Sequence, residues 1–249
     1  GRIFIDPGDP VIVGLPSYLG GINAFNSYGA KMIGIPMDEE GEDPVYMEER
    51  IKEQIAQGKR PKLIYLIPDF HNPAGMTMSE RRRREILDIA RRYDILILED
   101  SPYRELRYEG EEQKTIYELD GTGHVILLGT FSKIFCPGFR IGWVIGHPDV
   151  LDKIVVAKQS ADLCTPPFTQ RIAARFMEKG LLDSKIEEIK KMYSVKQKGM
   201  LKALEDFMPE EFTWTRPEGG LFLMLEGPEY LDTNAVLLDC IKEANVAYV

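Results

Sequence analysis

The sequence predicts an α/β protein in two parts: a three-layer α/β/α large domain with a mostly parallel sheet, and a small C-terminal α+β domain. Short apolar runs alternate with amphipathic helical patterns over the first two thirds of the 249 residues, which is typical of parallel strands joined by helical crossovers. The runs are continuously apolar rather than alternating, so we expect strands that are covered on both faces. Beyond them, a long Lys- and Glu-rich helical pattern followed by two short β-like runs predicts the small domain.

Four apolar runs are the predicted strands of the large domain: residues 11–13, 63–67, 95–98 and 125–128. A helix is predicted between the second and third strands, begun either by a capping box of Thr77 and Glu80 or by Ser79 as the N-cap. The four consecutive arginines at 81–84 point around most of the circumference of that helix. We interpret them as a solvated helix start and not as a nucleic-acid-binding face.

The C-terminal third predicts a helix followed by a hairpin. Residues 181–207 carry the helical pattern, and residues 212–215 and 221–225 are the two short strands. We therefore place the large domain at residues 1–165 and the small domain at residues 166–249.

The two ends of the chain predict a piece of a longer polypeptide. Residue 1 is not Met, and residues 245–249 resemble a strand that is just beginning. We expect that an N-terminal part of the large domain and a C-terminal part of the small domain are missing.

Composition and charge argue against several classes of function. The chain has 31 Lys and Arg against 40 Asp and Glu, a net charge of -9, whereas a nucleic-acid-binding protein usually has a basic excess. No apolar run reaches the roughly 18 residues of a membrane span, and the first residues do not read as a secretion signal. Cys136, Cys164 and Cys240 are widely spaced and have no histidine companions, which predicts neither disulfides nor a metal site and favours the cytoplasm.

Polar and aromatic side chains follow each of the four predicted strands, where ligands bind in open α/β sheets. Strand by strand, they are Tyr18; Asn72; Asp100 and Tyr103; and Thr130, Ser132 and Lys133, with Arg140 seven residues further on. Each has an ordinary explanation by itself, such as a surface lysine, a turn carboxylate, an Asx turn or a packing aromatic ring. Their presence together at four strand ends predicts one site.

These residues together match the task of holding a pyridine aldehyde that carries a phosphate and of using its ring as an electron sink. Lys133 can bond to the aldehyde carbon. Asp100 can keep the ring nitrogen protonated, because a cation gains from an adjacent carboxylate. Tyr18 can stack on the face of the ring.

The other residues match the remaining polar groups of such a molecule. Asn72 and Tyr103 can donate hydrogen bonds to a ring hydroxyl oxygen. Arg140, with the hydroxyls of Thr130 and Ser132, can hold the phosphate through charge-assisted hydrogen bonds. Every polar feature of the ligand then has a partner in the sequence.

Three motifs resemble those of the pyridoxal-phosphate-dependent aminotransferases of fold type I, class I/II. Residues 72–75 (Asn-Pro-Ala-Gly) are similar to the family's Asn-Pro-(Thr/Ala)-Gly motif, and residues 100–103 (Asp-Ser-Pro-Tyr) to its Asp-x-x-Tyr motif. Residues 130–143 are similar to its Ser/Thr-x-Ser-Lys-x6-Arg-x-Gly-Trp segment. The resemblance extends through essentially the whole chain, and residues 103–106 and 159–166 look most like the 2-aminoadipate and aromatic (kynurenine) aminotransferase branch.

This resemblance implies an enzyme that uses pyridoxal 5'-phosphate to move an amino group between an L-amino acid and a 2-oxo acid such as 2-oxoglutarate. The amino acid would be 2-aminoadipate-like, aromatic or branched, and the protein would be a homodimer. The catalytic residues would be Lys133, Asp100 and Tyr103. The cofactor-binding residues would be these three together with Tyr18, Asn72, Thr130, Ser132 and Arg140.

Two alternatives stay open: the effector domain of a GntR/MocR-type transcription regulator, and a lyase or decarboxylase on the same fold. A basic winged helix-turn-helix upstream would favour the regulator, and product analysis would separate the lyase. Two features of the family have no counterpart in the chain, namely a Gly-Ser-x-Gln-type phosphate loop, expected upstream, and the arginine for the substrate α-carboxylate, expected downstream. The histidines are predicted to be surface or loop residues without metal-binding companions: His71, His124 and His147.

Overall fold

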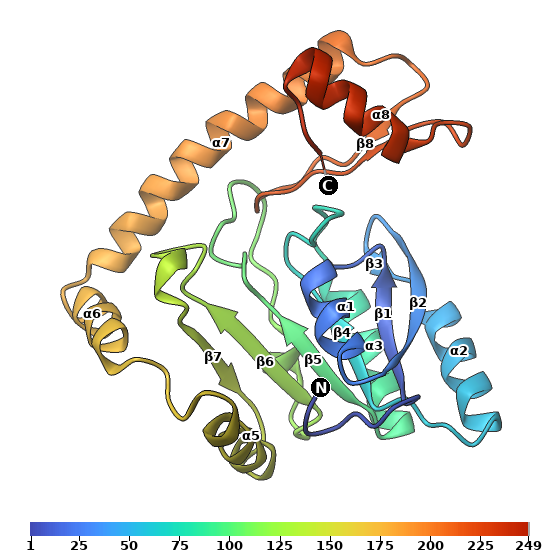
Figure 1. The fold of residues 1–249 in the computed structure, drawn as a ribbon, viewed down its shortest axis with the longest axis vertical. Coiled ribbons are helices and arrows are strands. Elements are labelled where there is room, and N and C mark those ends of the chain that lie inside the picture. The colour runs from blue at the N-terminus through green and yellow to red at the C-terminus, as the bar shows by residue number, and fades with distance from the viewer. Residues whose placement is uncertain (249) are drawn as a thin grey trace.

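Seven strands form one sheet within residues 1–248, the part of the chain that the structure, a computed structural model, describes. Their order across the sheet is β3-β2-β1-β4-β5-β6-β7 (Figure 1). The five inner strands are parallel to one another, and the edge strands β3 and β7 run antiparallel to their neighbours. The strands span Pro10–Leu15 (β1), Lys31–Asp38 (β2), Gly41–Glu42 (β3), Leu63–Leu66 (β4), Leu96–Asp100 (β5), Val125–Thr130 (β6) and Gly142–Ile145 (β7). The prediction of a mostly parallel sheet is confirmed.

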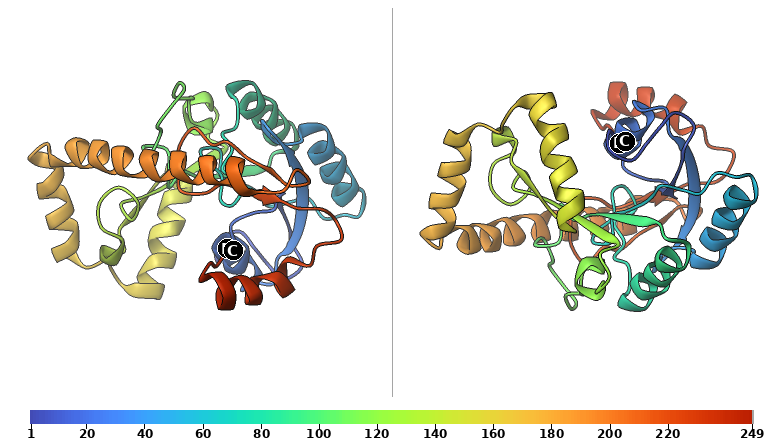
Figure 2. Two further views of the ribbon diagram at one scale, coloured as in Figure 1. Left: turned by 90° about the horizontal axis from the view of Figure 1, so that it is seen from above. Right: turned by 90° about the horizontal axis from the view of Figure 1, so that it is seen from below.

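Each face of the sheet has its own apolar core, because successive side chains of a strand point to opposite faces. Ile12 of β1 lies in the core that α2, α3 and α4 cover, and the next residue, Val13, lies in the core beneath α1. Figure 2 shows α1 on one side of the strands and α2 and α3 on the other. These helices span Leu19–Asn26 (α1), Pro44–Ala56 (α2), Glu80–Tyr93 (α3) and Ile116–Leu119 (α4). The arrangement has the three layers that the sequence predicts.

Helix α3 begins as one of the two predicted alternatives, but its arginines differ from the prediction. Ser79 is the N-cap, and its hydroxyl oxygen accepts a hydrogen bond from the backbone N–H of Arg82 at 3.2 Å. Arg81 and Arg84 are exposed, as expected of a solvated helix start, whereas Arg82 and Arg83 are only 5% and 0% exposed. The prediction is wrong for these two because each guanidinium meets a carboxylate and backbone carbonyl groups inside the protein.

The C-terminal third has the predicted helix and hairpin, and Figure 1 shows the long helix running from α6 to the unit of β8, β9 and α8. Helix α7 spans Leu181–Phe207, the predicted range, and the paired antiparallel strands are shorter than predicted. The domain boundary predicted at residue 165 falls between α5 and α6. The elements of this region are α5 (Pro148–Asp162), α6 (Pro167–Glu178), β8 (Thr213–Trp214), β9 (Leu225–Glu226), α8 (Thr233–Asp239) and a π-helical turn (Cys240–Ala244).

Three strands, β2, β3 and β7, were not among the predicted elements. Gly34 and Pro36 interrupt the apolar pattern of β2, and β7 starts with a glycine. The strand expected to begin in residues 245–249 is absent from residues 245–248, and residue 249 lies outside the described part. None of the helices in the described part combines the length and the hydropathy that a bilayer crossing requires.

Candidate active site

The predicted site residues follow strands whose carboxyl ends lie at one edge of the sheet. Strands β4 and β5 pair with Tyr65 opposite Leu98, and β5 and β6 pair with Asp100 opposite Leu128. Tyr18 follows β1 as the N-cap of α1, and its side chain is 42% exposed. Because parallel strands end at the same edge, the segments after β1, β4, β5 and β6 meet there.

Asp100, the last residue of β5, is half-buried and is held by a neighbouring strand. The hydroxyl of Tyr65 donates a hydrogen bond to Oδ2 of Asp100 at 2.7 Å. Burial raises the pKa of Asp100, and this hydrogen bond opposes the rise. Among residues 1–248, no group donates a hydrogen bond to Oδ1, so this oxygen is available to a ligand. Tyr65 was not among the site residues predicted from the sequence. Its only signal there is a hydroxyl group inside an apolar run.

Asn72 and Tyr103 meet at their polar ends. Nδ2 of Asn72 donates a long hydrogen bond, 3.5 Å, to the hydroxyl oxygen of Tyr103, whose ring packs edge-on against Phe222 at a centroid distance of 5.8 Å. Burial raises the pKa of Tyr103 to about 12, and the nearby Asp100 carboxylate adds to the rise. The phenol therefore keeps its proton near neutral pH and is a hydrogen-bond donor.

Lys133 lies in the segment after β6, and its amino group approaches the same phenol. Its Nζ is 5.8 Å from the centroid of the Tyr103 ring, near the outer limit of a cation–π contact. Within the described residues, the amino group takes part in no ion pair or side-chain hydrogen bond. The structure thus brings Asn72, Asp100, Tyr103 and Lys133 together, as predicted.

The residues predicted to hold a phosphate are assembled only in part. Oγ1 of Thr130 donates to the carbonyl oxygen of Ile141 at 3.2 Å and accepts from the backbone N–H of Ser132 at 3.0 Å, which shapes the turn after β6. Arg140 is exposed, and its Nη1 donates to the carbonyl oxygen of Pro137 at 3.3 Å. Over residues 1–248, no hydrogen bond joins Arg140 to Thr130 or Ser132.

A loop from the C-terminal third packs against the segments that carry the amide and the phenol. A Cβ atom at Gly75, which has a φ of +75°, would lie 2.6 Å from the carbonyl oxygen of Phe222. The hydroxyl of Tyr108 donates a hydrogen bond to the carbonyl oxygen of Gly220 at 2.5 Å. The backbone N–H of Gly220 donates a hydrogen bond to the carbonyl oxygen of Leu106 at 2.9 Å. This contact requires glycine at position 75, because a side chain there would push the loop away.

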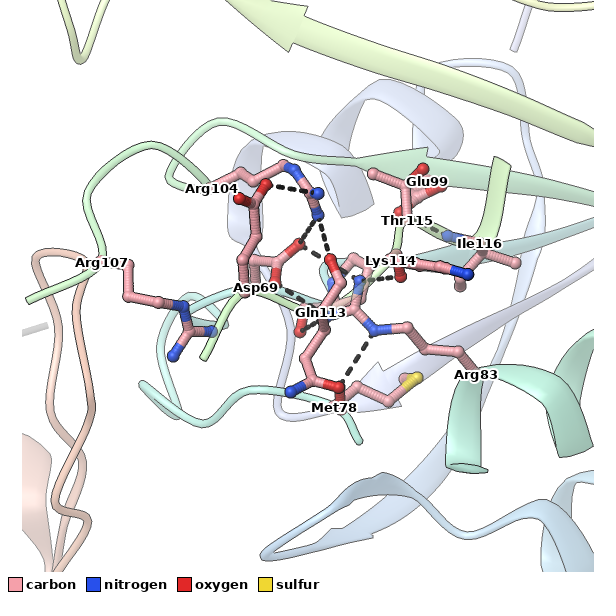
Figure 3. Close-up of polar contacts among 12 residues, drawn as sticks. Asp69, Met78, Arg83, Glu99, Arg104, Arg107, Gln113, Lys114, Thr115 and Ile116 are labelled. Carbon is pink, nitrogen blue, oxygen red and sulfur yellow. Dashed lines mark hydrogen bonds and ion pairs between the residues drawn. The ribbon is translucent and has the colours of Figure 1, made fainter. Parts of the chain in front are cut away.

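A buried ion pair between Arg83 and Asp69, drawn in Figure 3, supports the connection between β4 and α3. Asn72 belongs to the same connection. Nη2 of Arg83 is 2.8 Å from Oδ1 of Asp69, and Nη1 is 3.3 Å from Oδ2. Nη1 of Arg104 lies 3.7 Å from the same Oδ2. The other donors of Arg83 bond to the carbonyl oxygens of Pro68, Met78 and Lys114. Since Asp69, Pro68 and Met78 all belong to the connection between β4 and α3, Arg83 holds both ends of that connection.

His71 lies in a loop, the connection between β4 and α3, as one of the two predicted alternatives has it, but the loop is buried there. Its side chain is 1% exposed, and Nδ1 accepts a hydrogen bond from the backbone N–H of Ala74 at 3.3 Å. Burial lowers the pKa of His71 to about 4, so the ring is neutral at physiological pH. The neutral ring shapes the turn that follows Asn72.

Comparison with known proteins relates this arrangement to one family. Residues 1–249 match the profile of the family Aminotransferase class I and II. Aromatic-amino-acid aminotransferase 1 of Thermococcus litoralis is 48% identical over 249 residues, which are all of this chain and 60% of that protein. The 2-aminoadipate transaminase of Thermus thermophilus is 36% identical over all of this chain and 62% of its own length.

A solved structure has the same fold. The crystal structure of Pyrococcus horikoshii kynurenine aminotransferase, in complex with PMP, with KYN as substrate and KYA as product, superposes with a TM-score of 0.97 at 49% identity. The match covers 100% of this chain and 61% of that one. The chain therefore spans about three fifths of the length of the relatives it matches.

Proposed function

The chain belongs to the class I and II aminotransferase family, and we propose that the protein is a pyridoxal-phosphate-dependent aminotransferase. The observation that carries the proposal is the grouping of Lys133, Asp100 and Tyr103 at the carboxyl edge of the sheet. A primary amine without an ion pair in residues 1–248, a half-buried carboxylate with one oxygen to spare, and a protonated phenol lie around one point.

The groups assembled at this edge fit the ring and the aldehyde of pyridoxal 5'-phosphate one by one. Oδ1 of Asp100 would hold the ring nitrogen, and Nζ of Lys133 would bond to the aldehyde carbon. Asn72 and Tyr103 would donate to the ring hydroxyl oxygen. The exposed ring of Tyr18 would cover the face of the cofactor. The phosphate would be held by Thr130, Ser132 and Arg140.

When bound, pyridoxal 5'-phosphate supplies an electron sink for the electron pair that remains when the α-carbon of an amino acid loses its proton. Once the amine of the amino acid has displaced Lys133 from the aldehyde carbon, the free Nζ would accept that proton and later return it to that carbon, as general base and then general acid. The Asp100 carboxylate stabilises a proton on the adjacent ring nitrogen by its opposite charge. Tyr103 keeps its own proton and donates it in a hydrogen bond.

We also propose the class of substrate. The amino acid is 2-aminoadipate-like, aromatic or branched, and the acceptor is a 2-oxo acid such as 2-oxoglutarate. The names of the relatives, which include an aromatic-amino-acid aminotransferase, a 2-aminoadipate transaminase and a kynurenine aminotransferase, support this range. The net charge of -9 supports a protein that does not act on nucleic acid.

The organisation of the protein is part of the same proposal. Residues 1–165 form the cofactor-binding large domain and residues 166–249 the small domain, which meet where Tyr108 and Gly220 are bonded. The protein works in the cytoplasm as a homodimer. Large apolar side chains exposed on α5, such as Val155 and Val156 at 54% and 64%, support a partner surface on this helix.

The alternatives are a regulatory effector domain and a lyase or decarboxylase. The relatives named above are enzymes that transfer amino groups, which favours the aminotransferase. A lyase or decarboxylase would consume the amino acid without converting 2-oxoglutarate to glutamate. A regulator would bind the cofactor and release no product.

A glutamate-formation assay tests the proposed function. The purified full-length protein is incubated with pyridoxal 5'-phosphate, an aromatic or 2-aminoadipate donor and 2-oxoglutarate. Glutamate should form, and Lys133→Ala should lower its rate to background because no other group at the site can move the proton. Lys191→Ala, at an exposed position of α7, is the matched control and should keep the rate. Glutamate formation by Lys133→Ala above background contradicts the role of Lys133.

A further inference from the structure

Tyr65 is a buried tyrosine whose hydroxyl has, among residues 1–248, one hydrogen-bond partner, the carboxylate of Asp100. Its side chain is 2% exposed, in the apolar core beneath α1, where its ring packs edge-on against Phe25 at a centroid distance of 5.5 Å. Phenylalanine would fill this apolar space equally well. A hydroxyl in such a place costs free energy unless it is bonded, so packing alone does not account for tyrosine here.

The sheet register aims the Tyr65 hydroxyl at Asp100. Tyr65 lies opposite Leu98 on the adjacent parallel strand, and Asp100 is two residues beyond Leu98 and so on the same face. Burial and the neighbouring carboxylate raise the pKa of Tyr65, so the phenol keeps its proton and is the donor. Its bond to Oδ2 leaves Oδ1 as the oxygen without a donor among the described residues.

Gly21 of α1 makes room for this hydroxyl. A Cβ atom at Gly21 would lie 2.8 Å from both Cζ and the hydroxyl oxygen of Tyr65. Any side chain at position 21 would displace the phenol from Asp100, because its neighbours leave a buried ring no free space. The helix backbone and the strand therefore fix the hydroxyl from two sides.

We propose that Tyr65, with Gly21 behind it, is a positioning residue that holds the Asp100 carboxylate with Oδ1 directed at the cofactor ring nitrogen. This rests on the proposed function, because the ring nitrogen belongs to pyridoxal 5'-phosphate. Tyr65 acts through Asp100 and not by touching the reacting atoms. Its effect should therefore vanish when Asp100 can no longer interact as an anion.

A double-mutant cycle on cofactor affinity tests the proposal. Full-length apoprotein is titrated with pyridoxal 5'-phosphate for the wild type, Tyr65→Phe, Asp100→Asn and the double variant. Tyr65→Phe should weaken binding by about tenfold or more, the range of a hydrogen bond to a charged group. In the Asp100→Asn background the same change should alter affinity by less than about twofold.

Two further variants separate positioning from folding. Gly21→Ala keeps the phenol but moves it, and it should weaken binding as Tyr65→Phe does. Tyr93→Phe removes another tyrosine-to-carboxylate hydrogen bond of 2.7 Å, to Glu48, away from the site, and should leave affinity unchanged. Gly199→Ala, on α7 with no atom within 4 Å of the added Cβ, is the control for Gly21→Ala.

The outcomes distinguish a failure of the proposed function from a failure of the positioning role of Tyr65. A wild-type protein that does not bind pyridoxal 5'-phosphate overturns the proposed function and this inference together. A wild type that binds, with Tyr65→Phe equal to it, overturns the positioning role alone. Equal losses on Tyr65→Phe with and without Asp100 also overturn it, since Tyr65 would then act independently of the carboxylate.

Discussion

Two acidic residues near the same sheet edge, Asp69 and Asp100, use their bonding capacity in opposite ways. Asp69 is bonded through both oxygens to Arg83, whose remaining donors are taken by backbone carbonyl groups (Figure 3). Asp100 is bonded through one oxygen only, and the nearby Lys133 has no ion pair in residues 1–248. Buried charges whose partners are complete maintain the fold, whereas incomplete ones at a sheet edge indicate a ligand.

Depth in the molecule accounts for the difference. Asp69 lies in the connection that precedes α3, where its exposed fraction is 2% and an unpaired charge would be costly. Asp100 ends β5 at the edge where four connections diverge, and within residues 1–248 its Oδ1 receives no hydrogen bond. The same residue type therefore has a structural role in one place and a proposed chemical role in the other.

Exchanging each carboxylate for an amide should show the largest difference between the two residues. Asp69→Asn should lower the free energy of unfolding by about 3–5 kcal/mol, because it leaves Arg83 buried without its counter-charge, and should lower Tm by about 10 °C. Asp100→Asn should leave Tm within about 2 °C but lower transamination on the order of 100-fold to 1000-fold. Thermal unfolding measures the stability of both variants, and the glutamate assay measures their activity. A large loss of stability in Asp100→Asn would contradict the chemical role given to Asp100.

A third buried carboxylate, Glu42 of β3, differs from both, because one of its oxygens is buried and has no hydrogen-bond partner in the described part of the protein. Its Oε1 has no hydrogen-bond partner among the described residues, and burial raises the pKa of Glu42 to about 7. The folded state therefore binds the proton more tightly than the unfolded chain, whose value is 4.5, and stability from this group falls as pH rises from 4.5 to 7.

Glu42→Gln should remove that dependence. At pH 8 the variant should be more stable than the wild type by up to about 3 kcal/mol, since one pKa unit corresponds to about 1.4 kcal/mol. At pH 4.5 the two should be equal. Denaturant unfolding at both pH values measures the effect, with the exposed neighbour Glu39→Gln as the control for the loss of a charge. An equal stability difference at both pH values would contradict the buried titration.

The smallest effect on stability is expected at an exposed ion pair of α3, the helix that also carries Arg83. Arg84 pairs with Glu80 at 2.6 Å, one residue from Arg83, but its side chain is 53% exposed and water competes for it. Arg84→Ala should shift Tm by less than about 2 °C, whereas Arg83→Ala should shift it by about 10 °C. Comparable shifts in thermal unfolding would show that burial does not distinguish the two arginines.

Much of the fold and of the candidate site is visible in the sequence because both depend on local patterns. Continuous apolar runs mark the buried parallel strands, and the polar residues that follow them, such as Asn72, Asp100 and Lys133, mark the ligand edge. The long helix α7 is predicted to the residue because its charge pattern persists for its whole length. Strand β2 escapes prediction because Gly34 and Pro36 break the pattern.

The features that sequence reasoning missed depend on contacts between segments far apart in the chain. The Tyr65 hydroxyl meets Asp100 only through the register of two strands, and Gly21 meets Tyr65 only through the packing of a helix on the sheet. Helical periodicity cannot tell that Arg83 enters the interior, because its partners lie outside the helix: Asp69 in the connection before it, and the carbonyl group of Lys114 31 residues further along. Long-range pairing of polar groups therefore requires the structure.

The measurement that most directly tests the account identifies the lysine that carries the cofactor. Full-length protein saturated with pyridoxal 5'-phosphate is reduced with borohydride, which converts the bond between cofactor and lysine into a stable amine, and the labelled peptide is mapped by mass. The label is expected on Lys133, with none in Lys133→Ala. A label on another lysine, or none although the cofactor binds, would contradict the placement of the active site at this edge of the sheet.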